Sequence, residues 1–171
     1  KLMPDKREDE LIVGSLSQLS RQRKAVKKMN QPEMLLHLVN AKRRILIVDD
    51  EEINRNILEA ILANEYEIIQ AADGAEALQL AGEYCDTLSV IILDLIMPNI
   101  TGQEVLNRVK SDPKTRHIPV IIASGDESQE IECLTAGAID FIKKPYPDPG
   151  VIRARVLRTI QLAEDRKTIR S

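Results

Sequence analysis

The side chains of this chain that are best suited to chemistry stand at the ends of short apolar runs. A pair of acids, Asp49 and Asp50, follows one run, and a third acid, Asp94, follows another. A hydroxyl, that of Ser124, follows a further run, and an amine, that of Lys144, stands just beyond the last. Runs of this kind are typical of buried parallel strands. Ligands of an open parallel sheet bind beyond the carboxyl ends of its strands, so these five side chains are expected to meet at one edge.

The expected cluster has the composition of a magnesium and phosphoryl site. Carboxylates that are packed together repel one another, which raises their pKa. Mg²⁺ relieves this repulsion and commonly takes one or two carboxylates together with water and phosphate oxygens. A lysine ammonium suits a phosphoryl oxygen, and a serine hydroxyl donates to another. The set therefore indicates Mg²⁺-assisted phosphoryl transfer, with a carboxylate as the candidate covalent acceptor. A lone Asp in such a place more often caps a helix or turn, so the inference depends on the whole set.

The elements that must position these residues alternate along the chain. Helical spacing of apolar residues separates the apolar runs. The predicted strands are 44–48, Tyr66–Ala71, Leu88–Leu93, Pro119–Ala123 and Ala138–Ile142, and the predicted helices are Glu52–Ala63, Ala75–Glu83, Gln103–Lys110, Glu127–Ala136 and one that starts near Asp148. This alternation predicts an α/β fold, a doubly wound five-stranded parallel sheet with helices on both faces.

The charge of the chain is unevenly distributed. The 171 residues include 24 Lys and Arg against 27 Asp and Glu, a net charge of −3. Residues 1–44 carry a net +6, residues 45–150 a net −13 and residues 151–171 a net +4. The acidic body is a poor nucleic-acid binder, but it can concentrate a divalent cation.

Other classes of protein are disfavoured by simple features. No apolar run approaches the roughly 20 residues of a membrane-spanning helix. The two cysteines, Cys85 and Cys133, and the two histidines, His37 and His117, show neither zinc spacing nor a disulfide framework. A reducing cytoplasm is the expected compartment.

Four segments, in this order, resemble the CheY-like receiver domain of two-component response regulators. They are Ile45–Glu51 (ILIVDDE), Val90–Pro98 (VIILDLIMP), Val120–Gly125 (VIIASG) and Phe141–Tyr146 (FIKKPY). The steps from 50 to 94 and from 94 to 124 are also usual for that family. The resemblance covers about residues 43–163. It implies the flavodoxin-like strand order 2-1-3-4-5 and a signalling switch, a phosphoprotein of a phosphorelay, rather than a turnover enzyme.

The resemblance also implies roles for the acidic residues. Asp94 would accept a phosphoryl group from a sensor histidine kinase or a phosphotransfer protein. Asp50 and Asp94 would bind Mg²⁺ directly, Asp49 would help to hold it, and the backbone carbonyl of Ile96 would be a further ligand. Because Ile96 is apolar and lies near the path of an attacking water, slow loss of the phosphoryl group is expected.

The remaining roles concern the switch. Lys144, rather than Lys143, would bind the phosphoryl group, since it directly precedes Pro145, and the bond between those two residues is usually cis in the family. Ser124 would move toward a phosphoryl oxygen, and Phe141 would turn inward into the space vacated. The face formed by the predicted fourth helix, the fifth strand and the last helix would then change shape.

The chain departs from the usual receiver pattern in the loop 99–102, which keeps its glycine, and in three places from Ser124 onward. The segment from Ser124 to Gly137 is about two residues shorter than is common, Gly125 replaces an alanine, and Phe141 lacks the hydroxyl of the commoner tyrosine. Because the segment between Ser124 and Gly137 is shorter, the sequence does not determine which rearrangement the switch would make.

Basic ends flank the predicted receiver. Residues 1–42 are predicted to form a helical linker or a docking or dimerisation segment, which could make a homodimer. Residues 164–171 are predicted to start a linker to an output domain of a larger multidomain protein. The trimmed loop and the arginine-rich last helix resemble receivers that precede diguanylate cyclase (GGDEF) domains.

Three other functions compete with a phosphoacceptor receiver. A phosphatase of the haloacid-dehalogenase kind also uses a strand-end Asp with Mg²⁺ and Lys, but its Asp-x-Asp motif is absent because Leu95 and Ile96 follow Asp94. A pseudo-receiver that only binds partners would not need the five-residue set. A dinucleotide-binding fold is disfavoured because no Gly-x-Gly-x-x-Gly occurs.

Overall fold

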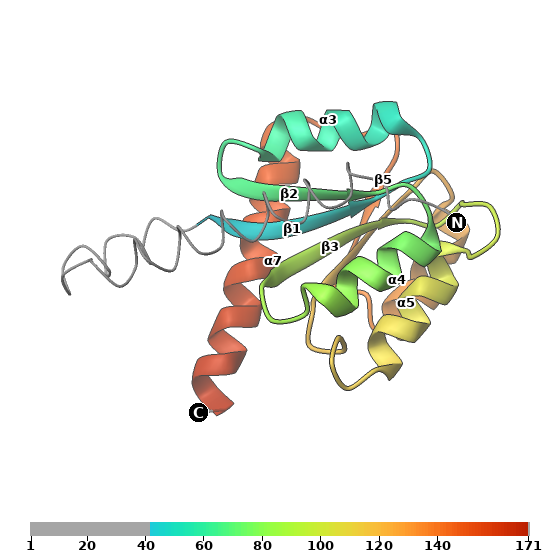
Figure 1. Ribbon diagram of the computed structural model, residues 1–171. Helices are drawn as coiled ribbons and strands as arrows, with labels where there is room; N and C mark the ends of the chain where they lie inside the picture. Colours follow the sequence, from blue (N-terminus) through green and yellow to red (C-terminus); the bar gives the residue numbers. More distant parts are fainter. Residues whose placement is uncertain (1–41, 171) are drawn as a thin grey trace, which may run out of the picture. The chain divides into compact units, whose positions relative to one another are not determined.

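The computed structural model describes residues 42–170, which form a parallel sheet covered by helices (Figure 1). The sheet has five strands in the order β2-β1-β3-β4-β5. The strands are β1 (Arg43–Val48), β2 (Tyr66–Ala71), β3 (Leu88–Asp94), β4 (Val120–Ser124) and β5 (Asp140–Lys143), and the helices are α3 (Glu52–Leu62), α4 (Gly74–Glu83), α5 (Gly102–Ser111), the short 3-10 turn η1 (Glu127–Gln129), α6 (Glu130–Thr135) and α7 (Pro149–Arg170). The predicted fold class and strand order are confirmed. The helix predicted within residues 1–42 lies outside the described residues.

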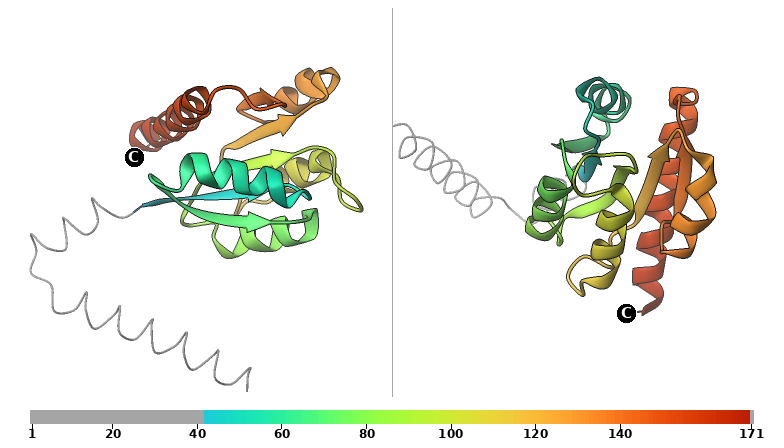
Figure 2. Two further views of the ribbon diagram at one scale, coloured as in Figure 1. Left: turned by 90° about the horizontal axis from the view of Figure 1, so that it is seen from above. Right: turned by 90° about the vertical axis from the view of Figure 1, so that its right-hand side faces the viewer.

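Helices cover both faces of the sheet, as the two views of Figure 2 show, and an apolar layer packs on each face. One layer packs α3 and α7 on one face through residues such as Leu58, Leu62 and Val156. The other packs α4, α5 and α6 on the opposite face through residues such as Ala77 and Leu106. All four residues of β1 from Ile45 to Val48 are buried, which explains why the central strands are apolar without alternation.

The chain between β4 and β5 differs most from the predicted elements. A single helix is predicted over Glu127–Ala136, whereas the structure has the turn η1 followed by the six-residue helix α6. The Asp126 carboxylate accepts the backbone N–H of Ser128 and so tightens the start of this segment. Strand β5 begins two residues later than predicted, because the Ala138 N–H still bonds back to the Cys133 carbonyl of α6.

Helix α7 continues past the sheet-covering part of the fold. It is 22 residues long, from Pro149 to Arg170. Arg43 at the start of β1 forms an ion pair with Glu164 at 2.8 Å, but both side chains are half exposed, so the pair adds little stability. None of the helices among residues 42–170 combines the length and apolar character needed to cross a bilayer.

The start of α5 is pressed against the end of β3. A Cβ atom at Gly102 would lie 2.0 Å from the Asp94 carbonyl oxygen and 2.6 Å from Leu95 Cα, both of them backbone atoms. The Gly102 N–H also donates to the Leu95 carbonyl at 2.9 Å. Only glycine allows this approach, which fixes the loop that follows Asp94.

Replacing Gly102 should therefore destabilise the fold. We expect Gly102→Ala to lower the free energy of unfolding by about 2 kcal/mol or more, because backbone must shift to admit the methyl group. Chemical denaturation followed by circular dichroism measures this. Gly82→Ala is the matched control: nothing lies within 4 Å of its Cβ position in α4, so it should stabilise by about 0.5–1 kcal/mol. Equal effects of the two variants would contradict the close approach.

Candidate functional site

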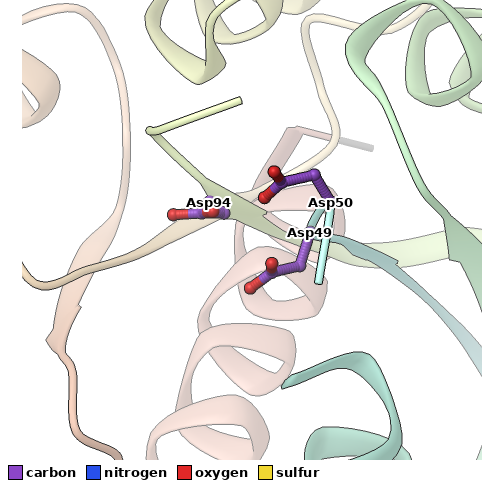
Figure 3. Close-up of side chains that lie close together, drawn as sticks. All are labelled: Asp49, Asp50 and Asp94. Carbon is purple, nitrogen blue, oxygen red and sulfur yellow. The ribbon is translucent and has the colours of Figure 1, made fainter. Parts of the chain in front are cut away.

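Three carboxylates gather at the carboxyl edge of the sheet. Asp49 and Asp50 follow β1, and Asp94 ends the neighbouring strand β3, where the parallel register pairs Val48 with Leu93. One oxygen from each carboxylate lies within 4.8 Å of the others (Figure 3). Asp49 and Asp94 are buried, while Asp50 is exposed, so the cluster opens toward solvent on one side.

The Lys144 ammonium lies between two of these carboxylates. Its Nζ is 2.7 Å from Asp49 Oδ2 and 3.4 Å from Asp94 Oδ1. The Lys144 N–H donates to the Ser124 carbonyl, and the following bond to Pro145 is cis, as the resemblance implies. Lys143 instead pairs with Glu127 at the exposed surface, at 2.6 Å. Of the two lysines, the structure therefore places only Lys144 among the carboxylates.

The environment of Asp94 makes its ionisation costly. Burial raises the pKa of the Asp94 carboxyl, the Lys144 ammonium opposes that rise, and the Asp49 carboxylate adds to it. The predicted mutual repulsion is thus present, but burial is the larger cause. A further positive charge would lower this cost, and three oxygen donors with one side open are the donor set that Mg²⁺ accepts. The residues at this edge therefore fit a magnesium ion.

Backbone contacts hold the acidic loop in place. Asp49 Oδ1 accepts the Glu51 N–H at 2.9 Å, and the Asp49 carbonyl accepts a hydrogen bond from Arg55 at 2.8 Å. Arg55 in turn donates to Gln70 of β2 at 3.0 Å. Arg55 was not identified from the sequence, because its contact with Gln70 is long-range and follows no local pattern.

Ser124 and Phe141 lie near the site but in a different arrangement from the expected switched one. Ser124 is fully buried at the end of β4, and its Oγ accepts the Asp126 N–H at 3.1 Å. Phe141 is already buried in the layer that contains Cys133, with 6% of its surface exposed. The inward turn of Phe141 expected on phosphorylation therefore has little distance left to cover.

Tyr146 is a further member of the site, and the sequence predicted no role for it. Its ring centroid lies 5.9 Å from Lys144 Nζ, within the range of a cation–π contact. Its hydroxyl is buried and has no hydrogen-bond partner among residues 42–170, and burial raises its pKa. An aromatic residue two positions after the lysine was the only sequence feature that could have indicated this contact.

Ile96 stands at the rim of the site. Its side chain is 65% exposed, and its N–H donates to Asp94 Oδ1 at 3.4 Å. The loop after β3 thus presents an apolar side chain next to the buried carboxylate.

The comparisons with known proteins agree with this geometry. The family model described as the response regulator receiver domain matches residues 45–157. The response regulator PleD of Caulobacter vibrioides is 42% identical over 126 residues, which cover 71% of this chain and 27% of PleD. A probable cyclic di-GMP phosphodiesterase of Vibrio cholerae is 38% identical over 119 residues, covering 68% of this chain and 26% of that protein. The chain thus spans about a quarter of the length of these curated relatives.

A solved structure gives the same result for the fold. The receiver domain of a sensor histidine kinase of Pseudomonas aeruginosa, crystallised with a magnesium ion coordinated in its active-site cleft, aligns with a TM-score of 0.64 at 25% identity. The alignment covers 71% of this chain and 99% of that one. With its acidic cluster, its strand order and a family match over most of its length, this chain belongs to the response regulator receiver domain family.

Proposed function

We propose that this receiver domain accepts a phosphoryl group on Asp94 from a phosphohistidine of a sensor histidine kinase or phosphotransfer protein. The observation that carries the proposal is the placement of Lys144 Nζ 3.4 Å from Asp94 Oδ1, in a carboxylate that Asp49 and Asp50 also approach. A nucleophilic carboxylate, a fixed ammonium and a set of metal ligands thus stand at one point of the surface.

The chemistry divides among these residues. A carboxylate oxygen of Asp94 attacks phosphorus, the P–N bond to the histidine breaks, and an acyl phosphate forms. The Lys144 ammonium neutralises charge on the phosphoryl oxygens, in a position that needs no reorganisation. Mg²⁺, held by Asp49, Asp50, Asp94 and the Ile96 carbonyl, would supply further positive charge to those oxygens.

Ser124 and Phe141 are proposed to transmit phosphorylation of Asp94 to the surface of the domain. A phosphoryl group adds roughly two negative charges and new acceptor oxygens beside Ser124. Its hydroxyl would turn toward them, and Phe141 would complete its packing in the space beside β4. The face formed by α6, β5 and α7 is then the surface that changes.

The proposal extends to the longer protein of which this chain would be a part. Residues 1–42 serve as a linker, docking or homodimerisation segment, 43–163 as the receiver, and 164–171 as the start of a linker to an output domain. A diguanylate cyclase of the GGDEF kind is the proposed output. The similarity to a probable cyclic di-GMP phosphodiesterase supports an output in the chemistry of that dinucleotide. The proposed compartment is the cytoplasm.

Labelling with a small phosphodonor tests the acceptor. We expect incubation with Mg²⁺ and acetyl phosphate to give one acid-stable, hydroxylamine-sensitive phosphoryl group per chain, measured by intact-protein mass spectrometry. Asp94→Asn should remove the label completely, because an amide is not a nucleophile for phosphorus. Asp165→Asn, a change at an exposed acid of α7, should leave the label unchanged. Removal of Mg²⁺ should suppress labelling.

The same assay separates the competing functions. A phosphatase would release phosphate over many turnovers without holding a label, and a pseudo-receiver would form no adduct. A label that persists in Asp94→Asn would place the acceptor elsewhere and refute the assignment.

The two neighbouring lysines provide a second test. We expect Lys144→Met to slow labelling about a hundredfold, because it removes a charge fixed beside the acceptor. Its Mg²⁺ affinity should rise, since the competing ammonium 2.7 Å from Asp49 is gone. Lys143→Met should change neither quantity, because Lys143 pairs with Glu127 at the exposed surface. Rates come from mass spectrometry and affinities from calorimetry. Comparable losses in both variants would count against the role of Lys144.

Phosphoryl lifetime tests the role of Ile96. We expect the wild-type acyl phosphate to be long-lived and Ile96→Asn to shorten its half-life about tenfold, a change of about 1.4 kcal/mol in the barrier. The physical reason is that an amide can orient the attacking water, whereas the exposed isoleucine cannot. Loss of the label is timed after removal of the phosphodonor. Ile53→Asn, a change at another exposed isoleucine, is the control. Equal half-lives in wild type and Ile96→Asn would refute this role.

A further inference from the structure

A cavity of about 260 Å³ lies at the other end of the sheet from the acidic site. It opens between the end of α5, the segments that lead into β4 and β5, and the C-terminal half of α7, the red helix that runs to the end of the chain in Figure 1. Its apolar wall consists of Pro119, Ile139, Leu162 and Ala163. Nothing in the proposed phosphoryl transfer uses this cavity.

Basic side chains surround the cavity. Four lysines and arginines and one histidine line it: Lys110, Arg116, His117, Arg166 and Lys167. Among the lining residues that the structure describes, none is acidic. Helix α7 carries two acids near this end, Glu164, which is engaged by Arg43 at 2.8 Å, and Asp165, and neither lines the cavity. The concentration of positive charge is notable because residues 45–150, which form most of the fold, carry a net charge of −13.

Two of these cations have no partner in the part of the chain that the structure describes. Within residues 42–170, the guanidinium groups of Arg116 and Arg166 make neither an ion pair nor a hydrogen bond. They come from different elements, the loop before β4 and helix α7, and face a common space. A guanidinium presents paired donors that match phosphate and carboxylate oxygens.

A hydroxyl on the cavity wall supplies an independent observation. Thr159 of α7 lines the cavity and is 5% exposed, yet its hydroxyl has no hydrogen-bond partner among the described residues. By contrast, the hydroxyl of Thr135 in α6 donates to the Ile131 carbonyl four residues earlier at 2.7 Å, and that of the buried Thr115 donates to the Val109 carbonyl at 2.8 Å. The buried side-chain atoms that are sealed from solvent without a partner belong to Arg44 and Tyr146, so the Thr159 hydroxyl is reached through the cavity. A hydroxyl that is open to the cavity and has no protein partner can donate to an oxygen bound there.

Lys110 gives the cavity a fixed wall. Its Nζ donates to the carbonyls of Arg116 at 3.1 Å and Ile118 at 2.7 Å, which leaves one of its three hydrogens unassigned. Its stem lies under Gly137, where a Cβ would be 3.2 Å from Lys110 Cγ. Burial lowers the pKa of this ammonium, a cost that a bound anion would offset. Lys110 thus fixes one wall of the cavity before any ligand arrives.

From these features we propose that the cavity binds a small organic phosphate. The phosphate would lie between Arg116 and Arg166, the Thr159 hydroxyl would donate to one of its oxygens, and a compact apolar or hydroxylated part would contact the apolar wall. The volume is just below the roughly 300 Å³ at which pockets for drug-sized ligands begin, so the ligand has the size of a phosphorylated three-carbon compound. A bound phosphate would join α7 to the α5–β4 loop and so restrain the C-terminal half of α7.

Titration of the whole 171-residue chain tests the site. Glycerol 3-phosphate, inorganic phosphate and glycerol are added separately in Mg²⁺-free buffer, and backbone amide shifts are followed by NMR. We expect saturable shifts at Gly137, Ile139 and Thr159 with glycerol 3-phosphate, weaker binding of inorganic phosphate and no binding of glycerol. Shifts confined to the amides around Asp94 and Lys144 would place the anion at the acidic site and overturn the proposal.

Variants decide which side chains bind the ligand. Arg116→Ala and Arg166→Ala should each weaken glycerol 3-phosphate at least tenfold, and Thr159→Val, which keeps the shape of the side chain, should weaken it several-fold. Arg153→Ala, which removes a charge from α7 away from the cavity, should leave the affinity unchanged. Equal weakening in Arg153→Ala would show only a general charge effect, and unchanged affinity in Arg116→Ala and Arg166→Ala would refute the site. Amide spectra of every variant establish that it is folded.

Discussion

The acidic edge of this domain depends on one ammonium group. Lys144 Nζ contacts buried oxygens of Asp49 and Asp94, which face each other across neighbouring strands. Two buried carboxylates without a cation would repel, and each would lose its hydration. One lysine offsets both costs only in part, since the pKa of Asp94 remains raised. The lysine therefore holds the carboxylates together but leaves an excess of negative charge. A divalent cation binds favourably to such a site.

The topology of the sheet imposes that arrangement. Asp49 and Asp94 are 45 positions apart in sequence, yet the parallel pairing of β1 with β3 brings both strand ends to the same level. Lys144 arrives from beyond β5, two strands away from β3, and only its long side chain spans the gap. Gly102 completes the constraint, because it lets α5 start against the carbonyl of Asp94 itself. A doubly wound sheet thus makes a cluster of charges from residues that have no local reason to meet.

The sequence was sufficient for features that depend on strong, repeated patterns. Apolar runs that lack alternation of polar and apolar residues indicated the buried strands of the sheet. The positions of Asp49, Asp94 and Lys144 at or just beyond strand ends indicated that these side chains would meet. Arg55 and the Tyr146 contact were not predicted, because each depends on a particular side-chain conformation across elements. The division of the predicted fourth helix into η1 and α6 was also missed. It depends on the Asp126 carboxylate, whose competition with helix formation cannot be weighed from residue types alone.

The resting contacts limit how the proposed switch can work. Lys144 already touches Asp94 and Phe141 is already buried, so phosphorylation would change the partners of the lysine rather than move it far. Ser124 is different: its Oγ accepts the Asp126 N–H at 3.1 Å, and that bond must weaken if the hydroxyl turns toward a phosphoryl oxygen. Asp126 caps η1, which leads directly into α6. A single hydrogen bond, from the Asp126 N–H to Ser124, therefore connects the phosphoryl site at Asp94 with the start of the shortened helix. Rearrangement of η1 and α6 then requires no large motion of the sheet.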